Sequence, residues 1–94
     1  MADYSIGEAV PFELIGTLPS NYEDYKTYKY VFHDTLSDGL EYNGDAKVYI
    51  DNVETENLFT VKYEGNALTI EAANLKTNEA IKKDSKIVVK YTAT

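Results

Sequence analysis

The chain of 94 residues contains no cysteine, a single histidine, two prolines and fewer basic than acidic side chains. Without cysteine, disulfide bonds and thiolate chemistry are excluded. Nine basic residues stand against sixteen acidic ones, which gives a net charge of −7. This charge argues against nucleic acid and anionic membranes as partners, because both are bound through basic surfaces. No apolar run is long enough to span a bilayer.

The residues that are present predict one all-β domain over residues 1–94. Hydrophobic residues make up 44% of the chain, which is enough for a core. Their spacing is mostly period two, which is typical of strands. Strands are expected within 9–14, 28–34, 46–52 and 86–94, a hairpin within 58–72, and a weak helix within 73–85. Asp38-Gly39 and Asn43-Gly44 are turn signals. Together these short strands indicate an antiparallel β-sandwich.

Asp34 is the residue whose orientation matters most for function. Because side chains alternate along a strand, Asp34 shares a face with Tyr28, Tyr30 and Phe32. If that face is the inner one, a carboxyl group lies at the margin of an aromatic core, where it can stay protonated and pass a proton. In the alternative interpretation the strand ends earlier, and Asp34 caps the following turn.

Three stretches of the sequence carry a family resemblance: IGEAVPFELIGTLPSNY, YKYVFHDTLSDGLEYNGDAKVYI and KIVVKYTAT. In this order and spacing they resemble the isopeptide-forming domain of Gram-positive fimbrial backbone proteins and surface adhesins, which has a CnaA-like, immunoglobulin-type fold. The resemblance covers nearly the whole chain.

The resemblance implies a self-cross-linking chemistry. In the family a lysine on the first strand and an asparagine on the last strand join through an amide bond, promoted by a buried carboxylate. The matching carboxylate is Asp34, and Tyr30 and Phe32 would form the supporting aromatic shell. No lysine precedes the first expected strand and no asparagine follows Asn78, so both bond partners are expected outside this chain.

The resemblance therefore implies a partial domain that lacks the family's first and last strands. The opening MADYSIGE resembles an added start before an excised segment. Removal of both strands would be expected to uncover the inner face near Val10, Phe12, Val89 and Tyr91. Such edges pair readily with another strand.

We accordingly expect a structural module of a Gram-positive pilus or adhesin, secreted to the cell surface or cell wall as part of a larger parent protein. Its expected partners are neighbouring domains, pilin subunits or a complementing β-strand peptide. Two alternatives stay open: an engineered half of a split ligation system or scaffold, and an adhesin module that binds a host protein or glycan. We expect no enzyme beyond self-cross-linking, no cofactor and no metal.

Other constellations carry weaker signals. His33 adjoins Asp34, but neighbours in a strand point to opposite faces and cannot easily form a catalytic pair. Several oxygen-bearing side chains could bind calcium, but their spacing fits no EF-hand loop: Asn43, Asp45, Asp51, Asn52 and Glu54. An exposed binding platform, or a cover over the edge of the core, could be formed by Tyr22, Tyr25 and Tyr42. The second interpretation is favoured for Tyr42.

Overall fold

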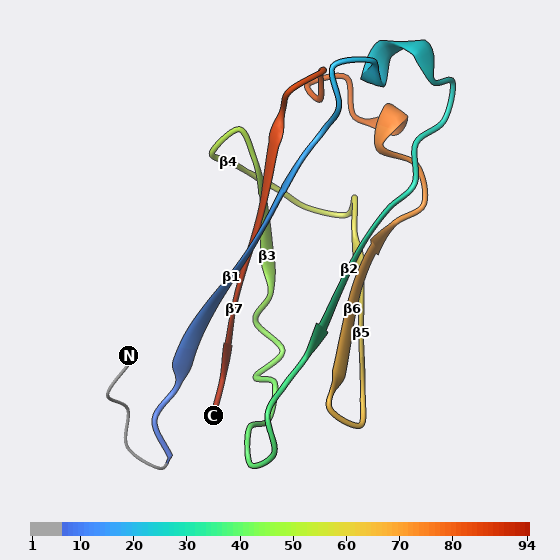
Figure 1. The fold of residues 1–94 in the computed structure, drawn as a ribbon. Coiled ribbons are helices and arrows are strands. Elements are labelled where there is room, and N and C mark those ends of the chain that lie inside the picture. The colour runs from blue at the N-terminus through green and yellow to red at the C-terminus, as the bar shows by residue number, and fades with distance from the viewer. Residues whose placement is uncertain (1–6) are drawn as a thin grey trace.

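The computed structural model describes residues 7–94 as two antiparallel sheets that face one another (Figure 1). One sheet has four strands in the order β1-β7-β3-β4, and the other has three in the order β2-β6-β5. The strands are β1 (Val10–Thr17), β2 (Tyr30–Thr35), β3 (Lys47–Ile50), β4 (Val53–Thr55), β5 (Thr60–Glu64), β6 (Ala67–Ala72) and β7 (Lys86–Ala93). The chain is an all-β, immunoglobulin-like antiparallel β-sandwich, as the strand pattern predicts.

The core lies between the sheets and follows the period-two pattern. Alternate residues of β7 and β6 are almost completely buried, and they are joined by Leu18, Tyr22, Leu36 and Leu75 from the connections. β7 is the centre of its sheet, since β1 pairs with it along one side over eight residues and β3 along the other. The expectation that Val89 and Tyr91 would be uncovered is therefore wrong: they are 0% and 2% exposed, because both neighbours of β7 are present.

The second strand begins later than the sequence predicts. The prediction starts it at Tyr28, whereas β2 starts at Tyr30. The backbone N–H of Tyr28 donates to Asn74 Oδ1 at 3.0 Å, and its carbonyl accepts from the N–H of Leu75 at 2.7 Å. The connection after β6 thus takes both backbone groups of Tyr28, and the ladder stops at the pair Tyr30–Ala72.

The connections contain helical turns rather than a helix. The segment expected to be a weak helix forms one 3₁₀ turn, η2 (Leu75–Thr77), and another turn, η1 (Tyr22–Asp24), precedes β2. None of the helical segments between residues 7 and 94 has the length and apolarity of a membrane span.

One strand, β4, is not among those expected from the sequence. It pairs with β3 through a two-residue turn in which Asp51 and Asn52 have φ angles of 48° and 72°. Both residues thus adopt the left-handed conformation that a type I′ hairpin requires, which aspartate and asparagine tolerate. The pair Asp51-Asn52 is therefore a hairpin signal that contains no glycine.

Candidate functional site at Asp34

Asp34 lies on the inner face of β2, near the end of the strand. Its Cα partner on β6 is Leu68, which is 1% exposed. Asp34 itself is half-buried, whereas its neighbours His33 and Thr35 are exposed. The carboxyl group therefore points toward the core, as one of the two interpretations predicts, but it is less buried than that interpretation requires. Because His33 and Asp34 occupy opposite faces, they do not form a catalytic pair.

The partner of Asp34 is Tyr91, on the opposite sheet. The Tyr91 hydroxyl donates a hydrogen bond to Asp34 Oδ2. This bond joins the end of β2 to an inner strand of the four-stranded sheet, and it spans the core. Burial raises the pKa of the Tyr91 hydroxyl well above its usual range, and the hydrogen bond to Asp34 and the carboxylate charge raise it further. Tyr91 therefore remains a proton donor throughout the neutral and moderately alkaline range.

Aromatic rings hold Tyr91 in place. Phe12 of β1 stacks on it with ring centroids 5.2 Å apart and an interplanar angle of 10°. Tyr42 meets the Tyr91 ring edge-on at 5.8 Å and lies 5.5 Å from Tyr63. Contacts of this geometry are favourable for aromatic rings and leave little freedom for rotation.

The predicted shell residues, Tyr30 and Phe32, extend the aromatic layer along β2. Their rings are 5.0 Å apart, and Phe32 also lies 6.2 Å from Phe59. Both side chains share the inner face with Asp34 and are half-buried. The structure thus brings the three residues of the predicted site to one face, while their chemical roles stay predictions.

Sequence reasoning missed Tyr91 as the hydrogen-bond partner of Asp34. The alternation of the last strand places Tyr91 inward together with Ile87 and Val89, and this much is readable from the sequence. What the sequence does not show is the stagger between two sheets that share no ladder. An inward tyrosine and an inward aspartate nonetheless form a natural pair, since a buried hydroxyl needs a partner.

No described lysine forms an ion pair with Asp34. Within residues 7–94 the one ion pair joins Lys29 Nζ and Glu71 Oε2 at 4.0 Å, and both side chains are exposed. Residues 1–6, which lie outside the described part, contain neither lysine nor asparagine. The expectation that the reactive lysine and asparagine lie outside this chain therefore stays a prediction.

The acidic turns have structural partners. Asp45 accepts hydrogen bonds from the backbone N–H and the hydroxyl of Thr92, at 2.8 and 2.6 Å. Asp51 accepts from the hydroxyl of Ser85 and the N–H of Lys86, both at 2.9 Å. Between residues 7 and 94, no three acidic or histidine side chains gather closely enough to hold a metal ion.

The tyrosine platform does not form as a unit. Tyr22 is 1% exposed, and Lys76 Nζ lies over its ring, 3.6 Å from the centroid. Tyr25 is 46% exposed. Tyr42 is half-buried against the core, and its hydroxyl accepts from the N–H of Ala46 at 3.0 Å, which agrees with the core-edge interpretation. An isolated exposed ring on Tyr25 is not a contiguous apolar patch.

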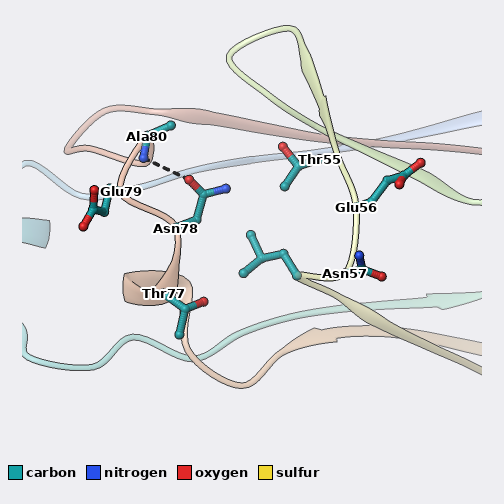
Figure 2. A pocket seen from close by; sticks show the side chains of 8 residues that line it. Thr55, Glu56, Asn57, Thr77, Asn78, Glu79 and Ala80 are labelled. Atoms are coloured by element: carbon teal, nitrogen blue, oxygen red, sulfur yellow. Dashed lines mark hydrogen bonds between the residues drawn. The ribbon is translucent and has the colours of Figure 1, made fainter.

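A hollow of about 550 Å³ lies between the segment after β4 and the turn that follows η2 (Figure 2). Thr55 and Asn78 face each other across it, and Asn78 Oδ1 accepts from the N–H of Ala80 at 2.9 Å. The carboxylates of Glu56 and Glu79 do not converge on the space. The hollow therefore lacks the grouped charges of a cation site, and none of its lining residues belongs to the Asp34 site.

The two described sheets form an immunoglobulin-like antiparallel β-sandwich, and the hydrogen bond between Tyr91 and Asp34 joins them across the core. Comparison with solved structures finds a match to the pilus backbone protein RrgB of Streptococcus pneumoniae, with a TM-score of 0.74 and 19% sequence identity. The match covers 97% of this chain and 21% of the matched chain, so this chain spans about a fifth of its length. At this identity the likeness establishes the fold. No protein-family model and no curated protein sequence matches the chain.

Proposed function

We propose that the chain is a structural module of a Gram-positive surface pilus or adhesin. The observation that carries the proposal is the shared fold: nearly the whole chain superposes on one segment of a pilus backbone protein. The acidic surface and the absence of cysteine are compatible with an extracellular module that uses another kind of covalent tie. The parent protein would then be displayed at the cell surface or in the cell wall.

The proposed tie is an amide bond between a lysine and an asparagine on strands that flank this chain, with Asp34 as the promoting carboxyl group. The lysine must be neutral to attack, and an apolar surrounding lowers its pKa. Lysine Nζ then bonds to the asparagine Cγ, the bond from Cγ to the side-chain nitrogen breaks, and ammonia leaves. A carboxyl group beside the reacting atoms can polarise the amide carbonyl and carry protons between the two nitrogens.

Two features of the site support this role for Asp34. Asp34 accepts a hydrogen bond from Tyr91, whose ring packs against Phe12 and Tyr42 on the core side. It also lies on β2, an edge strand of the described sheet, so that one side of the strand is free to receive a neighbour. Inner-face residues of β2 are half-buried, whereas Leu68, Ile70 and Ala72 of the adjacent β6 are at most 1% exposed.

Mass spectrometry tests the proposal directly. A chain extended on both sides by the residues that its gene encodes should, after folding, be lighter than its sequence mass by one ammonia. Asp34→Ala should retain the full mass, and tryptic peptides of the wild type should contain a linked lysine and asparagine. An extended chain that folds and keeps its full mass would refute the amide tie, although the structural role could still hold.

The unpaired edge of β2 indicates which kind of partner the chain would bind. An unpaired strand edge accepts another strand through backbone hydrogen bonds. We therefore expect the 94-residue chain to bind a synthetic peptide that carries the strand encoded upstream or downstream of it, or else to associate with a second copy. Light scattering with peptide titration distinguishes these outcomes. A monomer that binds neither peptide would contradict the expectation.

A further inference from the structure

The hydrogen bond from Tyr91 reaches one of the two carboxyl oxygens of Asp34 and not the other. The hydroxyl donates to Oδ2, and the described residues provide no hydrogen bond to Oδ1. Tyr91 is 2% exposed and lies on the central strand, stacked on Phe12 and contacted edge-on by Tyr42. Its hydroxyl oxygen is thus held by the core rather than by a flexible segment.

The Tyr91 hydroxyl also keeps its proton. Burial in the core disfavours a phenolate, and an adjacent carboxylate disfavours it further, so the pKa of Tyr91 is raised. Among the described titratable groups, Tyr42 contacts the Tyr91 ring and adds to the rise of its pKa, and Tyr63 lies beside Tyr42. None of the described lysines forms an ion pair there. Tyr91 therefore acts toward Oδ2 only as a donor.

We propose that Tyr91 is a positioning residue, which fixes the rotamer of Asp34 and leaves Oδ1 as the oxygen that exchanges protons with a reacting group. The carbonyl oxygen of a carboxylic acid accepts a hydrogen bond better than its hydroxyl oxygen does, so the bond from Tyr91 to Oδ2 favours Oδ1 as the position of a proton on Asp34. The side chain is held against rotation by a bond to the opposite sheet, at a point where β2 itself is an edge strand.

For the chemical step, this inference rests on the proposed function. As lysine Nζ bonds to the asparagine Cγ, Oδ1 accepts a proton from the attacking nitrogen and returns it to the leaving nitrogen, which departs as ammonia. The proton of Tyr91 does not move. The products are one amide and one ammonia, and Asp34 ends the reaction in the protonation state in which it began.

Nuclear magnetic resonance on the 94-residue chain tests the geometry. A buried tyrosine hydroxyl that donates a hydrogen bond to a carboxylate should give a slowly exchanging proton signal. Tyr91→Phe should remove this signal, and Asp34→Asn should move it upfield. Tyr49→Phe serves as the control, because Tyr49 lies on β3 and points to the outer face, where Lys90 Nζ is 5.2 Å from its ring. A Tyr91 signal that ignores Asp34→Asn would overturn the inference.

The kinetic arm uses the gene-extended chain and follows the loss of ammonia after refolding. Tyr91→Phe keeps the stacked ring, so the variant should fold, but its rate should fall about tenfold, since a hydrogen bond to a charged group typically contributes more than 1.4 kcal/mol. Tyr49→Phe should react at the wild-type rate. An undiminished rate in folded Tyr91→Phe would overturn the positioning role. If the wild type itself loses no ammonia, the proposed function fails, while the resonance measurement still decides whether Tyr91 holds Asp34.

Discussion

Gly16 of β1 lies against the tip of the Tyr30 side chain of β2, so that the tyrosine hydroxyl fills the space that a side chain at position 16 would need. A Cβ atom at Gly16 would contact the Tyr30 hydroxyl and would lie 2.8 Å from Cζ of the same ring and 3.2 Å from Cζ of Phe32. Gly16 is buried and pairs with Ile87 of β7. The glycine is therefore required by close packing and not by an unusual backbone angle.

Gly16→Ala should lower the free energy of unfolding by about 1–3 kcal/mol, the usual cost of overpacking. Urea denaturation measures the effect. Tyr30→Phe removes the hydroxyl that the new methyl group would strike, so the double variant should lose less than the sum of the single changes. Simple additivity of the two changes would show that the ring of Tyr30 does not occupy this position.

Asp34→Ala should destabilise the 94-residue chain by about 1–3 kcal/mol, because the buried hydroxyl of Tyr91 would lose its acceptor. Asp34→Asn retains an oxygen acceptor and should cost less. Urea denaturation at neutral pH compares the two variants. If both were as stable as the wild type, Asp34 would not be bonded to Tyr91 in solution.

Alkaline pH should destabilise the fold. Burial is the first cause that raises the pKa of Tyr22, Tyr30 and Tyr91, so in the folded state all three titrate above the usual value of 10.0. A raised pKa in the folded state means that their contribution to stability is complete below pH 10 and is lost as the pH rises further. Denaturation midpoints from pH 8 to 12 should be flat at first and then fall. Tyr91→Phe should show a shallower decline.

Asp45 should contribute to stability in the opposite pH range. Burial opposes its ionisation, but the hydrogen bonds from the hydroxyl and N–H of Thr92 outweigh that effect and lower the pKa of its carboxyl group below the usual 3.8. A lowered pKa in the folded state gives stability that is present above pH 3.8 and is lost as the pH falls through the folded value. Asp45→Asn should cost about 1 kcal/mol at pH 7 and less at pH 3. An equal cost at both pH values would contradict this.

The 94-residue chain should contain no internal amide bond. No described lysine lies in an ion pair with Asp34, and no asparagine follows Asn78 in the sequence. Its intact mass should therefore equal the unmodified sequence mass. The loss of one ammonia would show that a lysine and an asparagine within the chain react with each other, and the assignment of Asp34 would then have to be revised.

The sequence predicted the sandwich, and one of its two interpretations placed Asp34 on the inner face, because both depend on alternation along single strands. The predicted start of the second strand was wrong because the backbone of Tyr28 forms its hydrogen bonds with Asn74 and Leu75 and not with a neighbouring strand. The sequence pattern of one segment does not show such bonds to a distant segment. The prediction was also wrong about the exposure of Val89 and Tyr91, since exposure depends on which strands flank β7. That order is set by pairing between distant segments, which local patterns do not encode.

The candidate site shows the same division. The aspartate and its aromatic neighbours on β2 share one strand, so their common face could be predicted. Tyr91 comes from a strand 57 positions away, and the pairing depends on the stagger between the two sheets. For Tyr22 and Tyr25 the sequence left both an exposed platform and a core-edge position open, and the 3₁₀ turn of η1 buries Tyr22 while Tyr25 stays exposed.

The register of β1 on β7 has a mechanical consequence. Val10 lies opposite Ala93, so the polypeptide enters β1 and leaves β7 at the same end of the sandwich (Figure 1). Tension on a chain that continues from both strands would separate them one hydrogen-bonded pair at a time, like a zipper, instead of loading all the pairs of the ladder together. Such a ladder yields at low force on its own. Under such a load the β1–β7 ladder would depend on a fastening at the end where Val10 and Ala93 lie opposite each other.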